Sequence, residues 1–376
     1  MSKLMLDEES ELILDGSKII WHQERLEQWK RGERFAPITI DMALTQACQY
    51  NCEFCYAKLQ QNKGHRITFE IMKNFIDDCA EIGVKAISLV SDGESTANPI
   101  YQDVIVYGHE KGLSMALGTH GHTLTEDVLE KILPALTYIR VNFTAGEADR
   151  YAKIHGVPES YFYDVVENIK TAMRLKKQHG LDVTIGMQMV LMPEYADQIL
   201  PLAKLGKEIR PNYLVIKHCS DDEMGSLGVN YDGYERLFNL LKEAESYTDD
   251  EYLVKVKWSK IKSAGKRSYS CCYGPPFHLQ MSGSGLIAPC GSFFHPRYAR
   301  YHIAHIDQGD RLKDVVFSDR YWDVMNELAS EKFDAKTMCA ALCLQHKTNE
   351  VLDGYKKNKI SLDKPTGKKP QHIDFI

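Results

Sequence analysis

The apolar and polar residues of this chain alternate in blocks from residue 38 onward. Short apolar runs, typical of buried strands, lie at 38–44, 85–91, 113–118, 137–143, 183–191 and 213–217. Longer amphipathic stretches separate them, and the one from Thr68 to Ile82 carries apolar residues at helical spacing, with Gly83 as a stop signal. Because strands that alternate with helices build parallel sheets, the pattern predicts an α/β fold with helices outside a parallel sheet.

The segments on either side of this block have a different pattern. Residues 1–37 are polar with one amphipathic piece, which predicts a lead-in helix on the outside of the fold. A strand-like run at 252–258 is followed by a predicted hairpin over 277–290, which turns at Ser282-Gly283-Ser284-Gly285. Residues 352–376 carry six lysines and no periodicity, so we expect this tail to lie over the surface with its apolar end docked.

The composition narrows the class of protein. With 376 residues, of which 44% are hydrophobic and 26% charged, the chain is long enough for one large domain or two. A net charge of −6 gives no general attraction to phosphate backbones, which argues against a nucleic-acid binder. No apolar run reaches 18 residues and the N-terminus is acidic, so we expect no membrane span, no signal peptide and a cytoplasmic location.

The cysteines give the first indication of chemistry. Ten cysteines in a chain expected in the cytosol point to metal or redox chemistry rather than to disulfides. Cys48, Cys52 and Cys55 follow the first strand-like run with the spacing C-x3-C-x2-C. A [4Fe-4S] cluster normally takes four cysteine ligands, so three thiolates leave one iron with an open coordination position. A zinc knuckle is the alternative, although zinc loops usually combine two cysteine pairs.

This spacing, with the aromatic Phe54 just before the third cysteine, resembles the signature of the radical S-adenosylmethionine (SAM) superfamily. The resemblance implies that Cys48, Cys52 and Cys55 hold a [4Fe-4S] cluster whose open iron is chelated by SAM. One electron, from a flavodoxin- or ferredoxin-type donor, then cleaves SAM to a 5'-deoxyadenosyl radical that abstracts hydrogen from a substrate. The implied fold is a partial (β/α)6 barrel over residues 38–250, and in parallel barrels the chemistry lies at the carboxyl ends of the strands.

The ends of the other predicted strands supply candidate cofactor-binding residues. Gly93 and Glu94 follow the second strand and resemble part of the superfamily's Gly-Gly-Glu motif, which holds the amino group of SAM; the first glycine is Asp92 here. Thr119 ends the third strand and is expected to line the SAM pocket. Asn142, on the fourth strand, is expected to contact the ribose hydroxyls. An ordinary β-α turn is the alternative explanation of the second strand end.

Two polar residues on the last predicted strands are ambiguous. Gln188 lies within an apolar strand, where a buried amide needs a partner, so it either faces the cofactor or ties adjacent strands together. Lys217 stands at the end of the sixth strand, where an inward ammonium would need an anionic partner. We expect Lys217 to contact substrate or the SAM carboxylate, with a solvated lysine at a strand terminus as the alternative.

A second cysteine set lies in residues 251–351. Its order, an opening cysteine, a Gly-x4-Cys element and a closing C-x3-C, resembles the twitch form of the SPASM extension of radical SAM enzymes. The resemblance implies a β-hairpin plus helix domain that holds an auxiliary [4Fe-4S] cluster. Its four ligands would be Cys272, Cys290, Cys339 and Cys343, with Cys271 as the spare thiol. A zinc site with the same four thiolates is the alternative.

The chain as a whole resembles twitch-type radical SAM proteins of surface-polysaccharide and sugar pathways. The shared phrases include Leu26-Glu-Gln-Trp29, Tyr151-Ala-Lys-Ile-His155 and Leu214-Val-Ile-Lys217. This resemblance implies a small-molecule substrate, a sugar or nucleotide-sugar, that is dehydrogenated, epimerised or dehydrated. A peptide-modifying (RiPP-type) maturase is one alternative. A non-catalytic iron-sulfur electron carrier, which would need no open-site triad, is another.

Overall fold

The computed structural model of the chain describes residue 12 and residues 15–64, 66–341 and 343–376. Ten strands form one sheet in the order β10-β9-β8-β1-β2-β3-β4-β5-β6-β7. The strands from β8 through β1 to β7 run parallel, whereas β9 and β10 are antiparallel to their neighbours. The strands are β1 (Thr39–Met42), β2 (Ala86–Leu89), β3 (Ser114–Thr119), β4 (Tyr138–Asn142), β5 (Thr184–Leu191), β6 (Tyr213–His218), β7 (Leu253–Val256), β8 (His278–Met281), β9 (Leu286–Ala288) and β10 (Ala304–His305).

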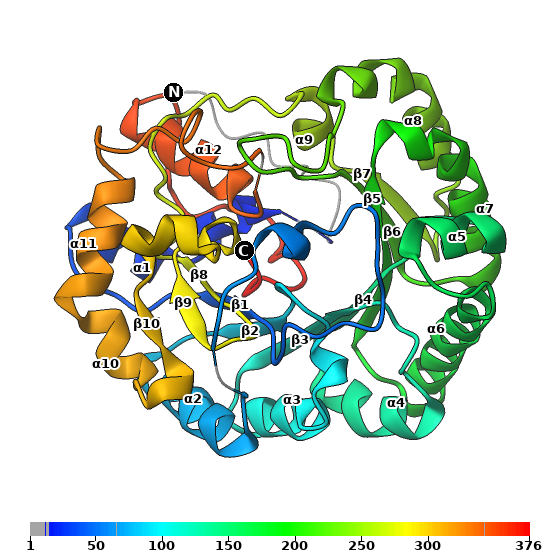
Figure 1. Ribbon diagram of the computed structural model, residues 1–376, viewed down its shortest axis with the longest axis horizontal. Coiled ribbons are helices and arrows are strands. Elements are labelled where there is room, and N and C mark those ends of the chain that lie inside the picture. The colour runs from blue at the N-terminus through cyan, green and yellow to red at the C-terminus, as the bar shows by residue number, and fades with distance from the viewer. Residues whose placement is uncertain (1–11, 13–14, 65, 342) are drawn as a thin grey trace.

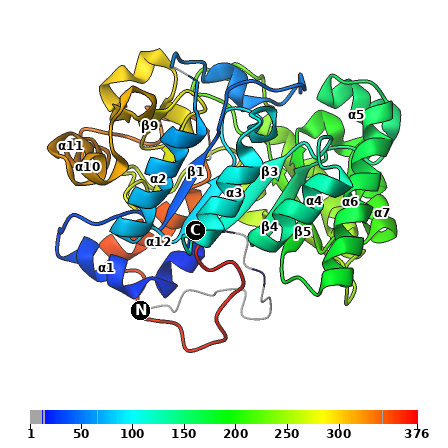
Figure 2. The same cartoon turned by 90° about the horizontal axis from the view of Figure 1, so that it is seen from below.

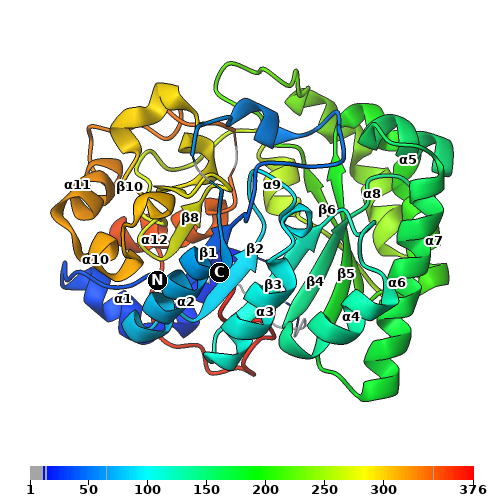
Figure 3. The ribbon, with the colours of Figure 1, turned by 60° about the horizontal axis from the view of Figure 1, so that its bottom comes forward.

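Helices form an outer layer around this curved sheet, and in Figure 1 they follow the rim of the molecule from α2 to α8. Figure 3 shows α2, α3 and α4 in front of the parallel strands. The helices are α1 (Gln23–Lys30), α2 (Phe69–Ile82), α3 (Tyr101–Glu110), α4 (Glu126–Ile132), α5 (Ala148–His155), α6 (Ser160–His179), α7 (Ile199–Ile209), α8 (Phe238–Glu245), α9 (Trp258–Lys262), α10 (Leu312–Phe317), α11 (Asp319–Leu328) and α12 (His346–Lys356).

The predicted α/β class and the six predicted strands are confirmed, because β1 to β6 fall within one residue of the six apolar runs or inside them. The helix signals also act as expected at α2. Its N-cap, Thr68, accepts a hydrogen bond from the backbone N–H of Ile71 at 3.4 Å, and Gly83 ends the helix in a left-handed conformation with φ 83°. The strand-like run at 252–258 forms β7, which pairs in parallel with β6.

The predicted hairpin, β8 and β9, does not stand apart from the barrel. Its first strand pairs in parallel with β1, with Thr39 opposite His278 and Met42 opposite Met281. The hairpin therefore extends the barrel sheet beside the first cysteine loop. The turn after β8 and the loop after β1 are brought to the same edge of the sheet.

The C-terminal end of the chain covers the amino ends of the barrel strands, as Figure 2 shows from below. Thr39 donates a hydrogen bond to the carbonyl of Asp374 at 2.5 Å, and Phe375 packs in a small cluster with Tyr138. The expected docking of the apolar end is confirmed. Leu352, where the surface tail was expected to begin, is buried inside α12 instead. In the part of the chain that the structure describes, no helix is long and apolar enough to cross a bilayer.

Candidate functional site

The first cysteine loop lies between β1 and a short 3-10 helix, Tyr56–Leu59, at the carboxyl end of the barrel. Cys48 is exposed, whereas Cys52 and Cys55 are half-buried. The loop is held on the end of α5, because the N–H groups of Asn51 and Glu53 donate to carbonyls of that helix at 3.1 and 2.9 Å. Three thiols thus stand on one short loop whose backbone is fixed by another strand-helix unit.

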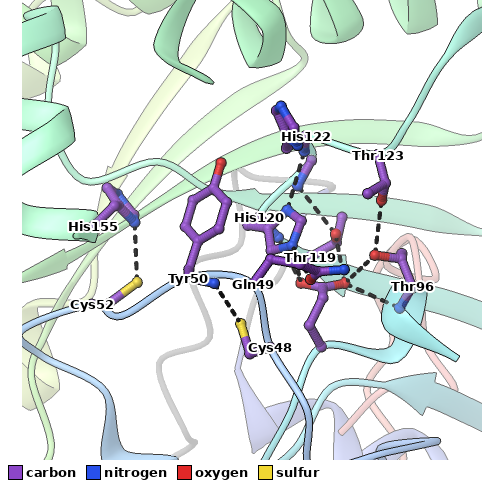
Figure 4. Close-up of polar contacts among 12 residues, drawn as sticks. Cys48, Gln49, Tyr50, Cys52, Thr96, Thr119, His120, His122, Thr123 and His155 are labelled. Carbon is purple, nitrogen blue, oxygen red and sulfur yellow. Dashed lines mark hydrogen bonds and ion pairs between the residues drawn. The ribbon is translucent and has the colours of Figure 1, made fainter. Parts of the chain in front are cut away.

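His155, at the end of α5, contacts this loop directly, as Figure 4 shows. Its Nε2 accepts a hydrogen bond from the backbone N–H of Thr144 at 3.1 Å. The ring proton is therefore assigned to Nδ1, which lies 3.2 Å from the sulfur of Cys52 and donates to it. Sequence reasoning missed this role, and the only signal was the place of His155 in the phrase Tyr151 to His155.

Glu94 and Thr119, two predicted cofactor-binding residues, are brought together in the structure. Both are buried, and the Thr119 hydroxyl donates to Glu94 Oε1 at 2.8 Å. Glu94 Oε2 accepts from the backbone N–H of His120 at 3.0 Å, and Thr96 donates to Oε1 (Figure 4). The ring of His120 stacks on Tyr50 of the cysteine loop at 4.1 Å. The ends of β2 and β3 are thereby joined to the loop.

The end of β2 keeps one glycine of the motif, Gly93, and has Asp92 in place of the other, and the contacts of both residues give the reason. A Cβ on Gly93 would lie 1.9 Å from the carbonyl oxygen of Thr45, so only glycine fits against the start of the cysteine loop. Asp92 accepts hydrogen bonds from the N–H of Gly283 at 2.8 Å and the hydroxyl of Ser282 at 2.5 Å. The carboxylate that replaces the motif's first glycine therefore ties β2 to the turn of the hairpin.

Asn142 and Gln188 form a side-chain pair on the inner face of the sheet. Gln188 Nε2 donates to Asn142 Oδ1 at 2.5 Å, which ties β5 to β4. The other amide atom, Gln188 Oε1, is buried without a hydrogen-bond partner among the described residues. The pair therefore joins adjacent strands and also presents an unsatisfied acceptor to the interior.

A cavity of about 260 Å³ joins these residues to both cysteine sets. Its wall includes Cys55 from the first loop, Cys290 and Cys343 from the second set, and Lys217. Lys217 lines this interior space instead of extending into solvent. Burial, together with the nearby cations Arg140 and Lys260, lowers the pKa of its ammonium to about 7. Also on the wall are Asp92, Asn142, Gln188, Arg140 and Lys260.

The second cysteine set lies in a core of its own beside the hairpin. Cys272 and Cys290 are buried there, and Cys339 and Cys343 are half-buried against the same core. A hydrogen bond with Cys290 is the main cause that lowers the pKa of Cys343 to about 5. The spare thiol, Cys271, instead donates to the carbonyl of Ser330 at 3.7 Å.

The donor chemistry at both places fits iron-sulfur ligation, because soft thiolates are the ligands that such clusters take. The second core is well supplied with donors to sulfur. Asn349 donates to the sulfur of Cys272 at 3.3 Å, and Arg267 donates to that of Cys339 at 3.6 Å. In the described part of the chain, no three His, Cys, Asp or Glu side chains are grouped closely enough to hold a single metal ion.

Comparison with known proteins agrees with this geometry. The sequence model of the radical SAM superfamily matches residues 42–205, which include the first cysteine loop and β2 to β5. This segment is therefore similar to radical SAM domains. The solved structure of SuiB from Streptococcus suis bound to SAM superposes with a TM-score of 0.62 at 14% identity, covering 81% of this chain and 71% of that one. At this identity the likeness shows the fold alone, and it confirms the predicted radical SAM fold.

Two curated proteins are similar to parts of this chain. An AdoMet-dependent heme synthase of Methanosarcina barkeri is 31% identical over 128 residues, which cover 34% of this chain and 36% of that protein. An S-adenosylmethionine-dependent nucleotide dehydratase of Pseudoalteromonas ulvae is 23% identical over 126 residues, which cover 29% of this chain and 41% of that protein. The matched segments span well under half the length of either relative.

Proposed function

We propose that this protein is a radical SAM enzyme that removes a hydrogen atom from a sugar or nucleotide-sugar in the cavity between its two cysteine sets. The observation that carries the proposal is the wall of that cavity. Cys55 from the first set and Cys290 and Cys343 from the second set all line it. A substrate held there would touch both redox centres, and an electron carrier without a substrate needs no such space.

The residues around the cavity have separable roles in this proposal. Cys48, Cys52 and Cys55 hold the first [4Fe-4S] cluster, while Gly93, Glu94 and Thr119 shape the pocket for SAM. Bound there, the cluster and SAM would supply the carbon-centred radical that takes the hydrogen atom. Cys272, Cys290, Cys339 and Cys343 hold the auxiliary [4Fe-4S] cluster.

The polar groups of the cavity wall suit the oxidation of a carbinol. In that reaction the carbon loses a hydrogen atom, the hydroxyl loses a proton, and one electron passes to the auxiliary cluster. Lys217 faces the cavity, and because its pKa is lowered to about 7 a large share of its amine is neutral at pH 7 and can accept the proton. The amide pair Asn142 and Gln188 offers hydrogen-bonding groups for sugar hydroxyls or the ribose of SAM. We therefore favour dehydrogenation over epimerisation or dehydration.

The proposed enzyme also requires an electron donor and a suitable cellular compartment. The first cluster needs one electron for each SAM cleaved, and we propose a flavodoxin- or ferredoxin-type donor as its source. Such donors and oxygen-sensitive clusters belong in the cytoplasm, which is where we place the protein.

The decisive experiment is anaerobic reconstitution with iron, sulfide, SAM and a panel of nucleotide-sugars. We expect 5'-deoxyadenosine to form and one sugar to lose two mass units, with one product per SAM cleaved. Loss of water, or unchanged mass with deuterium uptake at one carbon, would replace dehydrogenation by dehydration or epimerisation. Release of 5'-deoxyadenosine with a peptide substrate and none of the sugars would establish the maturase instead. A protein that takes up zinc and never cleaves SAM would refute the proposal as a whole.

A further inference from the structure

A second cavity, of about 420 Å³, lies deeper in the barrel. It is lined by the C-terminal end of the chain, including His372 and Phe375, and by residues of β1, β4, β6, β7 and β8. Arg140 and Lys260 line both this cavity and the one beside Cys55. We name the deeper space the basic chamber, because most of the charged groups on its wall are cations.

Two cations of the basic chamber have no counter-charge in contact. Arg140 points inward from β4, and Lys257 follows β7. Within the described part of the chain neither side chain makes a hydrogen bond or an ion pair. The guanidinium of Arg140 lies over the ring of Tyr138 at 5.7 Å, which positions it without satisfying its donors.

Two further cations of the chamber wall bond to carbonyl oxygens instead of carboxylates. Lys18 Nζ donates to the carbonyl of His372 at 2.9 Å, and Lys260 Nζ donates to that of Cys343 at 2.7 Å. A carbonyl orients an ammonium but does not neutralise it. Burial lowers the pKa of both ammonium groups, that of Lys18 to about 7, and an anion bound in the chamber would favour their charged forms.

The two acidic side chains on the chamber wall already have partners. Asp15 accepts from the N–H and the hydroxyl of Ser17 at 2.9 and 2.5 Å. Asp41 lies with Oδ2 at 3.0 Å from Nε2 of His278. Buried cations without partners are costly, and a lysine can escape the cost by losing its proton, but an arginine cannot. Arg140, which is half-buried and faces the cavity, therefore marks a position where an anion would be favoured.

We propose that the basic chamber binds the phosphoryl or diphosphate group of the substrate. Arginine presents a planar fork of donors that matches phosphate oxygens, and lysines add further charge around it. Because Arg140 lines both cavities, an anion held in the chamber would leave the sugar next to Cys55 and the amide pair. The assignment of this anion to the substrate, with the sugar next to Cys55, rests on the proposed function. The anion site itself is argued only from the unpaired cations on the chamber wall.

The test measures binding without catalysis. The full-length protein, reconstituted anaerobically, is titrated by calorimetry with inorganic pyrophosphate at fixed ionic strength, and separately with malonate, a dicarboxylate. We expect pyrophosphate to bind in one-to-one stoichiometry and more tightly than malonate. Arg140→Met should weaken its binding at least tenfold, and Lys257→Met should weaken it as well. The matched control is Arg174→Met, whose arginine is exposed on α6 and pairs with Glu126.

Each outcome decides the question. Absence of pyrophosphate binding by the wild type, or binding that neither chamber variant changes, would overturn the inference. Tighter binding of malonate would assign the chamber to a carboxylate and overturn the phosphoryl assignment. If Arg140→Met fails to fold, Lys257→Met alone carries the comparison with Arg174→Met. Because no SAM is cleaved in this assay, its failure leaves the proposed function standing, and failure of sugar turnover leaves the anion site standing.

Discussion

The two cysteine sets are built in opposite ways. The first lies on an open loop at the barrel mouth, with Cys48 exposed, and is held by backbone hydrogen bonds and by His155. The second lies in a hydrophobic core of its own, where Cys272 and Cys290 are buried. An open loop leaves room beside the thiols for a further ligand, whereas a closed core does not. The difference supports a catalytic role for the first set and an electron-storing and structural role for the second.

The largest effect should follow from removing a ligand of the open loop. Cys52→Ala should lower reductive SAM cleavage by more than about a hundredfold, because the first cluster loses one of only three ligands. The measurement is 5'-deoxyadenosine release with a chemical reductant. Cys79→Ala is the control, since that thiol is buried on α2 outside both sets. Normal release by Cys52→Ala would remove the contrast between the two sets.

The second set should respond differently to the same kind of change. Cys290→Ala should keep slow SAM cleavage but yield no oxidised sugar, and its iron content should fall from about eight to about four per chain. Measuring iron, 5'-deoxyadenosine and product in one preparation tests this, with Cys271→Ala as the control. An iron content of about four with one zinc in the wild type would show that the second set is a zinc site.

Lys217 lies in the cavity between the sets and should affect the chemical step alone. Lys217→Met should lower sugar turnover by about 10²–10⁴-fold while leaving SAM cleavage in place. The neutral amine is the active form, so the wild-type rate should rise as pH increases through about 7 and then level off. The residual rate of the variant should lack this rise. A wild-type profile without an inflection near pH 7 would contradict the role of Lys217.

His155 should influence only the first set, by about tenfold or more in SAM cleavage. A hydrogen bond to a thiolate stabilises the reduced cluster, so His155→Phe should shift the potential of the first cluster to a more negative value. His155→Gln retains an N–H donor and should restore part of the shift. Redox titration followed by electron paramagnetic resonance separates the two clusters. Equal shifts in both variants would mean that His155 acts through packing.

The smallest effect is expected from the hydrogen bonds that join the end of β2 to the turn of the hairpin. Asp92→Ala removes the acceptor for Gly283 and Ser282 and should lower the free energy of unfolding by about 1–3 kcal/mol. Anaerobic urea denaturation measures it, with the exposed Asp250→Ala as the control. An unchanged stability would show that β1–β8 pairing alone holds the hairpin to the barrel.

The sequence predicted what depends on neighbours along the chain. Strand and helix positions follow from periodicity, and the ligand spacing of Cys48 to Cys55 is local. Glu94 and Thr119 were placed at strand ends, and the rule that parallel strands end at one edge brought them together correctly. Gln188 bonds to Asn142 on the adjacent strand, as one of its two predicted roles requires, and its role toward the cofactor stays a prediction.

What the sequence could not predict depends on contacts between distant segments. The hydrogen bond of His155 to Cys52 joins residues on two different strand-helix units. Arg140 looked like an ordinary strand residue until the closing of the barrel placed Lys257 and Lys260 near it. The parallel pairing of β8 with β1 has no local signal, because either strand could have been an edge. Asp92 was noted as a departure from a motif, and only the position of the hairpin explains it.

The carbonyl region of Thr45 lies between two glycines, Gly93 and Gly283, each too close to allow a Cβ. Three backbone segments are thus stacked without any side chain between them, and backbone atoms do not change rotamer. The spacing from the first cysteine loop to the hairpin that carries Cys290 behaves as a fixed length. The rate of electron tunnelling falls steeply with distance. This stack would therefore keep the rate of electron transfer between the two proposed clusters constant when the surrounding side chains change conformation.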